Sequence, residues 1–389
     1  MVKPNSPPPS NTPPPGPLPS EGRGSLREKL IAQIRQTGPI TVADYMRACL
    51  YDPEHGYYST RPKLGGDKAD FITAPEASQM FGELVGLWCA HEWSNINAPF
   101  DLIELGPGRG VLMQDAVRAT SRLSDFTSAA NITFIETSAP LRDEQKERVP
   151  HANWADGLEQ IPPRPSLIIA NEFLDCLPIR QFVRDGEHWR EKLVGVGENN
   201  ELVFGLSPPS PPGEGAGGGV KRPTSSNTPP PVPLPSRGGG AAFELSPALP
   251  AFIDTLSQRL HAFPGRALFI DYGYAEPEGA DTLQALRNHQ KEHPLAHPGE
   301  ADLTAHVDFG NLARLATEAG LSVNGPMTQR DFLRALGVEQ RAAALAKANP
   351  ERAERIAREL HRLTHQDEMG VLFKVLCLSS PHLPPPAGF

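Results

Sequence analysis

The chain contains few cysteines, no long apolar run and no run of basic residues. Its four cysteines lie far apart and form no C-x-x-C pair, which argues against a disulfide framework or a structural zinc site. No stretch of 18 apolar residues occurs, so no membrane-spanning helix is expected. The N-terminus has neither the apolar segment of a secretory signal nor the Arg-rich amphipathic stretch of a transit peptide. These absences predict a soluble cytoplasmic protein.

Acidic residues outnumber basic ones. The chain has 389 residues, with 37 Lys and Arg against 46 Asp and Glu, which gives a formal net charge of −9. A dedicated nucleic-acid binder neutralises phosphates with basic residues, so no stable nucleic-acid partner is expected, although a nucleic acid stays open as a transient substrate. The length allows two or three average domains, or one large α/β domain with insertions.

The 43 prolines are unevenly spread, with dense patches in residues 1–24 and 207–240. These patches offer almost nothing to bury, so both are expected to be disordered. The segment from Ser10 to Ser20 recurs with one mismatch from Ser226 to Ser236. We interpret the copies as a DNA-level repeat read in frame at two tolerated surface sites. A polyproline ligand for a partner is the functional alternative.

A glycine-rich turn joins a predicted buried strand at residues 100–105 to a predicted helix. It contains Gly106, Gly108 and Gly110, and Glu104 lies two residues upstream. Glycines here allow positive φ and let a ligand approach the backbone, while the helix N-terminus points its N–H groups at it. The spacing is G-x-G-x-G rather than the G-x-G-x-x-G of dinucleotide sites. It resembles the first motif of class I S-adenosylmethionine-dependent methyltransferases; a tight turn without a ligand is the alternative.

After this turn, strand and helix patterns alternate, which is typical of a parallel, doubly wound sheet. Antiparallel strands are predicted within residues 179–206, a long polar loop at 272–308, and helices through 328–363. His289, His293 and His297 have helical spacing, but Pro294 and Pro298 break such a helix, so no metal site is expected. The expected regions are a tail (1–24), an N-terminal helical segment (25–95), a cofactor-binding half (96–178), a β insertion (179–206), a low-complexity insert (207–240) and a second half (241–380).

Polar residues at strand ends are candidates for cofactor contacts, because ligands of open parallel sheets lie beyond the carboxyl ends of the strands. Glu136 ends the second strand, where an acid would bind both ribose hydroxyls; an exposed strand-end acid is the alternative. Trp154 could stack on an adenine and Asp156 could bind its N6 group. Core packing is an equal alternative for Trp154.

Asn171, Glu172 and Asp175 follow the strand at 166–170, next to the place expected for a sulfonium methyl group. Methyl transfer is an in-line displacement that mostly needs positioning. Carboxylates bind a guanidinium acceptor through paired charge-assisted hydrogen bonds, so we expect these residues to be catalytic. The alternative is that acidic residues simply favour a helix N-terminus.

Taken together, the chain resembles the MidA family of methyltransferases, whose mitochondrial members are respiratory complex I assembly factors. The resemblance covers about residues 26–378 without the proline-rich stretches. It departs from the family at Lys68-Ala69 and in the length of 207–240. The matching segments are Asp70-Phe-Ile-Thr-Ala-Pro-Glu76, Phe81-Gly-Glu83, Glu104-Leu-Gly-Pro-Gly-Arg-Gly110, Asn171-Glu-Phe-Leu-Asp-Cys-Leu-Pro178, Asp271-Tyr-Gly273, Thr282-Leu-Gln-Ala285, Pro298-Gly-Glu-Ala-Asp-Leu-Thr-Ala-His-Val-Asp-Phe309, Met369-Gly370 and Phe373-Lys374.

The resemblance implies a class I methyltransferase fold: a mostly parallel, Rossmann-like seven-stranded sheet with an N-terminal helical segment and a β insertion. It implies S-adenosylmethionine as cofactor and arginine methylation of a core subunit of the NADH:quinone oxidoreductase. Substrate contacts are then expected from Asp70, Thr73, Pro75, Glu76, His306 and Asp308. A methyltransferase for a small molecule or RNA and a non-catalytic assembly chaperone remain alternatives. The acceptor residue, the degree of methylation and the choice between monomer and homodimer are left open.

Overall fold

The computed structural model describes residues 24–60, 73–208, 232–233, 242–276 and 279–389. Asp70 and nearly all of both proline-rich segments lie outside these ranges, so the predictions made for them are not addressed by the structure. Within the described ranges, no helix combines the length and the apolar composition that a membrane span requires.

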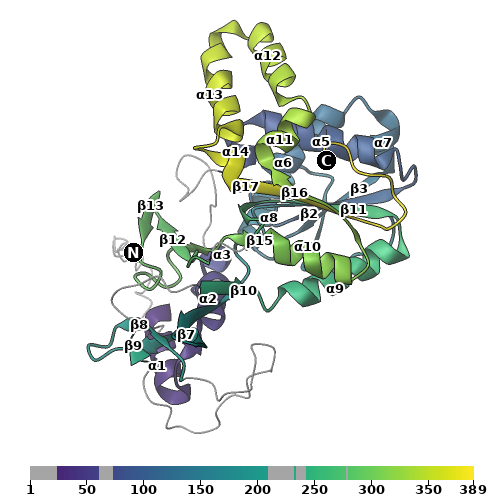
Figure 1. The fold of residues 1–389 in the computed structure, drawn as a ribbon. Coiled ribbons are helices and arrows are strands. Elements are labelled where there is room, and N and C mark those ends of the chain that lie inside the picture. Colours follow the sequence, from purple (N-terminus) through teal and green to yellow (C-terminus); the bar gives the residue numbers. More distant parts are fainter. Residues whose placement is uncertain (1–23, 61–72, 209–231, 234–241, 277–278) are drawn as a thin grey trace, which may run out of the picture.

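Helices cover both faces of a central sheet, and a second group of helices and antiparallel strands lies below it in Figure 1. The helix predicted after the glycine turn and the helices predicted through residues 328–363 are confirmed. The α-helices are α1 (Leu26–Thr37), α2 (Val42–Tyr51), α3 (Tyr57–Thr60), α4 (Ala74–Ala77), α5 (Gln79–Trp93), α6 (Val111–Thr120), α7 (Ser124–Ala129), α8 (Ala139–Arg148), α9 (Leu249–Ala262), α10 (Phe309–Glu318), α11 (Gln329–Ala335), α12 (Val338–Ala348), α13 (Ala353–Thr364) and α14 (Met369–Leu372). Two 3-10 helices are η1 (Leu158–Gln160) and η2 (Pro350–Arg352).

The central sheet has the predicted, mostly parallel architecture. All neighbouring strands pair in parallel except β17, which is antiparallel to both of its neighbours. The short β15 (Val307–Asp308) pairs in parallel with the last two residues of β11. In spatial order the strands are β16 (Ser322–Thr328), β17 (Phe373–Ser379), β11 (Gly265–Tyr274), β5 (Ser166–Asn171), β2 (Phe100–Leu105), β3 (Ala130–Ile135) and β4 (Asn153–Ala155).

Alternate residues of the central strands face two different cores, because side chains alternate along a strand. On one face, Leu102 and Leu167 pack with α5, α6 and α11. On the other face, Ile103 and Ile168 pack with α9 and α10. All residues of β2 and β5 are buried, which explains their almost continuous apolar sequences. The strand order switches at β2: β3 and β4 follow on one side of it, whereas β5 and β11 follow on the other. A crevice is expected at the carboxyl ends of the strands at this switch point.

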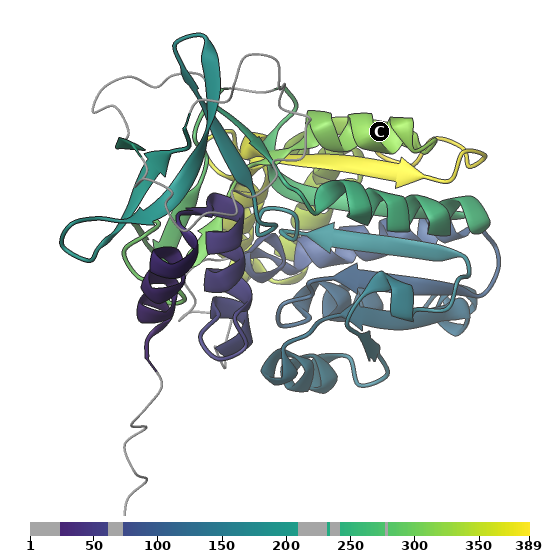
Figure 2. The ribbon, with the colours of Figure 1, turned by 90° about the horizontal axis from the view of Figure 1, so that it is seen from below.

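The N-terminal helices pack against the strands of the insertion, as Figure 2 shows from below. Ser25 and Glu28 form a capping box at α1, and Thr41 caps α2 by accepting from the Asp44 N–H at 3.0 Å. The antiparallel sheet has the order β10-β6-β7-β8-β9, with β1 also paired to β7. Its strands are β10 (Ala242–Leu245), β6 (Arg180–Asp185), β7 (His188–Val196), β8 (Leu202–Leu206), β9 (Val232–Pro233) and β1 (Ile40–Thr41).

One expectation for the second half of the chain was wrong, and one strand was missed. The region 272–308 is not a polar loop: it contains β15 and a three-stranded antiparallel sheet of β12 (Gln284–Arg287), β13 (Gln290–Glu292) and β14 (Asp302–Thr304). These strands are too short and polar for an alternating pattern to emerge. The strand β16 was not predicted, because Gly325 and Pro326 interrupt it where its pairing with β17 shifts register.

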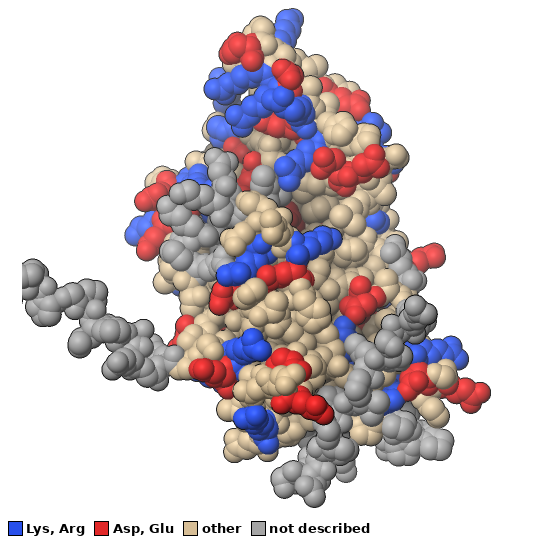
Figure 3. All heavy atoms as spheres, turned by 90° about the vertical axis from the view of Figure 1, so that its left-hand side faces the viewer, with Lys and Arg blue, Asp and Glu red and all other residues tan. Residues whose placement is uncertain are grey.

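The α12–α13 hairpin projects from the top of the molecule, where Figure 3 shows Lys and Arg side chains gathered. Within α13, Arg355 pairs with Glu359 at 2.8 Å and Arg358 pairs with Glu354 at 2.9 Å. These i,i+4 pairs balance the charge of both arginines locally.

Candidate active site

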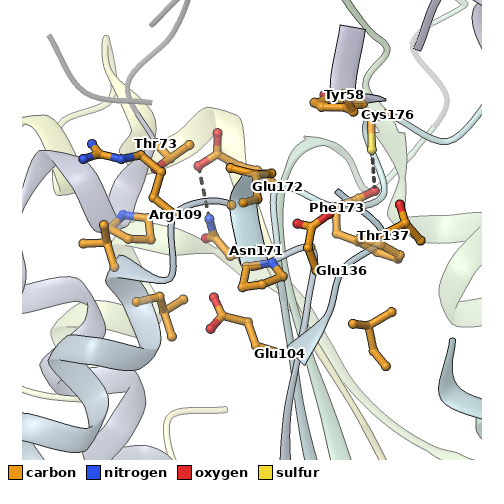
Figure 4. Close-up of a pocket in the computed structure, with 18 of the residues that line it drawn as sticks. Tyr58, Thr73, Glu104, Arg109, Glu136, Thr137, Asn171, Glu172, Phe173 and Cys176 are labelled. Carbon is orange, nitrogen blue, oxygen red and sulfur yellow. Dashed lines mark hydrogen bonds between the residues drawn. The ribbon is translucent and has the colours of Figure 1, made fainter. Parts of the chain in front are cut away.

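A cavity of about 410 Å³ opens at the carboxyl ends of β2, β3 and β5, at the expected switch in strand order. Figure 4 shows its polar side chains converging from the glycine turn, the strand ends and the loop before α4. It is lined by Tyr51, Tyr58, Thr73, Pro75, Glu76, Glu104, Gly106, Pro107, Gly108, Arg109, Val111, Leu112, Ile135, Glu136, Thr137, Leu141, Asp156, Asn171, Glu172, Phe173, Cys176 and Leu177.

The glycine turn forms the floor of the cavity between β2 and α6. Gly106, Gly108 and Gly110 have φ values of 60°, 52° and 77°, so all three positions use the left-handed region that favours glycine. A Cβ at Gly106 would lie 3.0 Å from the ring of Phe173, whereas one at Gly108 would meet no atom within 4 Å. Because Gly108 lines the cavity, that open space is available to a ligand close to the backbone.

Glu104 places a buried carboxylate at the end of β2. Its side chain is buried, and its Oε2 has no hydrogen-bond partner among the described residues. Burial raises the pKa of Glu104 from its ordinary value of 4.5 to about 8. A cationic group in the cavity would give this oxygen a partner and stabilise its charged form. The site therefore fits a ligand that carries a positive charge near the glycine turn.

Glu136 follows β3 and lines the same cavity. Its Oε1 accepts from the Ser138 N–H at 2.8 Å, and burial raises the pKa of its carboxyl group. Asp156 also lines the cavity and accepts from Arg142 at 2.6 Å. Trp154 does not line it: the indole packs near Phe134 and donates to Gln145 at 2.8 Å. The structure thus places Trp154 in a packing role, the alternative considered from the sequence.

Glu172 and Asn171 lie at the end of β5, facing the cavity. Glu172 Oε1 accepts from the Ala74 N–H and from Asn171 Nδ2, both at 3.2 Å. Burial, followed by the nearby Asp175 charge, raises the pKa of Glu172 to about 8. Glu172 also has a φ of 50°, a conformation that costs a non-glycine residue about 1–3 kcal/mol and concentrates at functional sites.

Thr73, Pro75 and Glu76 form the wall opposite the strand ends. Glu76 accepts from Arg109 at 3.4 Å, and Arg109 also donates to Glu144 at 2.9 Å. The positive charge of Arg109 is therefore already matched by two acids. Neither Glu104 nor Glu172 pairs with a basic side chain among the described residues.

Besides Trp154, four predicted residues do not line this cavity. One is Gly110, the N-cap of α6, where a Cβ would lie 3.3 Å from the side chain of Gln145. Asp175 is buried beneath it and accepts from the Tyr272 hydroxyl, and burial raises its pKa to about 6. His306 and Asp308 line a small neighbouring cavity, where Asp308 caps α10 by accepting from the Asn311 N–H at 2.8 Å. Both lie after β14, and Asp308 belongs to β15, which pairs in parallel with the end of β11.

The wall residues that were not predicted as site residues include Tyr51, Tyr58, Arg109 and Cys176. Tyr51 Oη donates to the Cys176 carbonyl at 3.1 Å, and Tyr58 Oη donates to Asp302 at 2.8 Å. The signals available were the aromatic cluster at 51–58 and the position of Cys176 beside the catalytic candidates. Neither signal indicates that α2 and α3 fold over the cavity.

Comparison with known proteins agrees with this geometry. Residues 84–327 match a family described as "Putative S-adenosyl-L-methionine-dependent methyltransferase". The chain is 33% identical to a protein arginine methyltransferase NDUFAF7 homolog of Caenorhabditis elegans, over 94% of this chain and 88% of the relative. It is 35% identical to protein arginine methyltransferase NDUFAF7 of Mus musculus, over 90% and 83%. A Burkholderia thailandensis structure bound to S-adenosyl-homocysteine has the same fold, with a TM-score of 0.77, 24% identity and 94% coverage of both chains.

These relatives correct one expectation. The Caenorhabditis elegans and Mus musculus proteins are mitochondrial, so the prediction of a cytoplasmic location is wrong. It rested on the absence of signal-like composition, which does not identify a compartment. The predicted enzyme class and cofactor are confirmed by the family match. The chain therefore belongs to this family of S-adenosylmethionine-dependent methyltransferases, as its resemblance to the MidA proteins predicted.

Proposed function

We propose that this protein methylates an arginine side chain of a protein substrate, a core subunit of the NADH:quinone oxidoreductase. The relatives named as protein arginine methyltransferases support the acceptor class. The observation that carries the proposal is Glu172: a half-buried carboxylate with a strained φ of 50° that faces the cavity beside Asn171. A guanidinium is a permanent cation with a planar set of donors, which suits such a carboxylate.

We assign the cofactor to the side of the cavity formed by the glycine turn and β3. Gly106 and Gly108 would cradle it against the backbone, and Glu104 would pair with its amino group. Glu136 would accept from the ribose hydroxyls. When bound, S-adenosylmethionine supplies an electrophilic methyl group on a sulfonium. The unpartnered Glu104 Oε2 and the open space at Gly108 support this assignment.

On the acceptor side, Glu172 and Asn171 bind and orient the guanidinium. The Ala74 N–H and Asn171 hold Glu172 Oε1, and no donor among the described residues contacts Oε2. That oxygen can accept from the guanidinium and take up the proton that leaves when the nitrogen forms its new bond to carbon. Thr73, Pro75 and Glu76 would border the incoming substrate. Asp175, buried behind the wall, would support this arrangement without touching the acceptor.

Incubation with labelled S-adenosylmethionine and lysate of a strain lacking the protein tests the proposed acceptor. We expect label in a protein band, with methylated arginine after acid hydrolysis. Label in RNA or in small molecules would instead support the alternative that the protein methylates RNA or a small molecule. Absence of transfer by a preparation that binds the cofactor would support a non-catalytic assembly role.

The affinity for S-adenosylmethionine is expected to rise with pH. In the free protein the pKa of Glu104 is about 8, so at pH 6 its carboxyl is protonated and must lose a proton to pair with the cofactor amino group. Linkage then predicts an affinity gain approaching about tenfold per pH unit well below pH 8, which levels off near pH 8 as the carboxyl becomes ionised and the cofactor amino group begins to lose its proton. Calorimetry between pH 6 and 8.5 measures this slope.

The stability of the free protein is expected to change in the opposite direction. The folded-state pKa of Glu104 lies above its ordinary value of 4.5. The contribution of this carboxyl group to the free energy of unfolding is therefore fully present below pH 4.5 and is lost as the pH rises through about 8. Glu104→Gln should reduce the pH dependence of both the cofactor affinity and the stability. An unchanged pH dependence of cofactor affinity in this variant would remove Glu104 from the binding site.

A further inference from the structure

The carboxylate of Asp271 binds the backbone turn that follows β5. Its Oδ2 accepts hydrogen bonds from the N–H groups of Phe173, Leu174 and Asp175, at 3.1, 2.9 and 3.3 Å. The residue is 1% exposed, so solvent cannot take over these contacts. Three hydrogen bonds to one oxygen fix three successive peptide units, and losing that acceptor would leave buried N–H groups without a partner.

This turn begins at Glu172, whose φ of 50° is rarely adopted by residues other than glycine. The parallel pairing of β5 with β11 ends at Asn171 and Ile270, and the Glu172 N–H donates to the Ile270 carbonyl at 2.9 Å. Asp271 is the next residue of β11 and therefore lies directly beside the turn. Its carboxylate binds the amides that follow Glu172, and so holds the backbone from which Glu172 reaches the cavity.

The far end of the turn has separate anchors. The Asp175 carboxylate accepts from the Tyr272 hydroxyl, and the Asp175 carbonyl accepts from the Ala305 N–H at 2.9 Å. The Tyr272 ring packs against Phe373, with centroids 5.5 Å apart. Because these contacts do not involve the amides after Glu172, loss of the Asp271 carboxylate would loosen the start of the turn while its end stays attached.

We propose that Asp271 is a positioning residue for methyl transfer, which acts by holding the 172–175 turn so that Glu172 faces the acceptor. The catalytic part of this inference rests on the proposed function; the positioning itself does not. Asp271 touches neither the cavity nor the acceptor, and Glu172 is the group through which it acts.

Asp271→Asn is the matching test, because it keeps the shape and removes the charge. In the wild type, the second carboxyl oxygen, Oδ1, accepts from the Tyr272 N–H at 2.9 Å. An asparagine has only one acceptor oxygen, so if that oxygen faces the turn, the asparagine NH₂ group faces the Tyr272 N–H and one of the two contacts is lost. We expect kcat to fall about 10- to 100-fold through misplacement of Glu172. The Kd for S-adenosylmethionine should stay within about twofold, since the glycine turn is unchanged.

A double-mutant cycle separates positioning from general destabilisation. In a Glu172→Gln background, Asp271→Asn should lower kcat by less than about twofold, because the group that it positions is already lost. Asp101→Asn is the control: Asp101 is equally buried, lies near the start of β2 and binds Arg164 and Arg259 at 2.9 Å. It should lower Tm without lowering kcat. Additive losses in the cycle would refute the proposal.

Amide hydrogen exchange tests whether Asp271 holds the turn and needs no measurement of methyl transfer. The Phe173, Leu174 and Asp175 amides should exchange faster in Asp271→Asn than in the wild type or in Asp101→Asn. Unchanged protection of these amides would overturn the proposal. If the wild type methylates no protein, the proposed function fails, while the exchange result still decides whether Asp271 holds the turn.

Discussion

Replacing Glu172 by Gln is expected to lower the rate of methyl transfer by a factor of about 100 or more, the range associated with a lost catalytic base. The amide keeps the size of the side chain and can still accept from Ala74 and Asn171. It cannot carry the negative charge that pairs with a guanidinium or take up its proton. Affinity for S-adenosylmethionine should stay within about twofold, because the cofactor is assigned to the glycine turn and β3.

Single-turnover transfer from labelled cofactor, together with calorimetry, measures both quantities. Glu191→Gln is a suitable control, since Glu191 is a buried acid paired with Arg180 at 2.6 Å in the β insertion, away from the cavity. That variant should lose some stability and keep its turnover. A Glu172→Gln rate within about threefold of the wild type would exclude Glu172 from catalysis.

Gly108→Val is expected to abolish measurable cofactor binding, a loss of about 100-fold or more in affinity. The new side chain would project into the open space beside Gly108, which lines the cavity. It would also occupy the place where a ligand approaches the backbone, and bulky branched residues are strained at a φ of 52°. Calorimetric titration with S-adenosylmethionine measures the loss.

The chain offers a matched control for the backbone strain. Gly186 has a φ of 64° in the turn between β6 and β7, and a Cβ there would also meet no atom within 4 Å. Gly186→Val should therefore lower Tm by a similar amount and leave cofactor affinity unchanged. Equal losses of affinity in both variants would point to general destabilisation, and unchanged affinity in Gly108→Val would refute the cofactor placement.

Local patterns explain why the centre of the molecule could be predicted. The strand before Gly106 and the helix after Gly110 depend on apolar runs and glycine positions close in sequence, and they have the expected form. The parallel-sheet rule then brought Glu136 and Glu172 to one cavity without any knowledge of their contacts.

The parts that could not be predicted depend on contacts between distant segments. Tyr51 reaches the cavity through a hydrogen bond to a residue 125 positions away. Asp271 binds amides almost 100 positions upstream, at separations of 96 to 98 residues. Trp154 and His306 have the right residue types near the right strands, but their direction is set by packing that sequence spacing does not encode.

The position of β17 also constrains the order in which the protein is completed during synthesis. This strand lies between β11 and β16, although its residues, 373–379, are translated after those of every other strand that the structure describes. Until they leave the ribosome, the edge of β11 has no partner on that side, and Ala267 to Ile270 are all fully buried in the finished sheet. Unpaired apolar edges promote aggregation. Nascent chains stopped before residue 373 should therefore depend on chaperones far more than the full chain does.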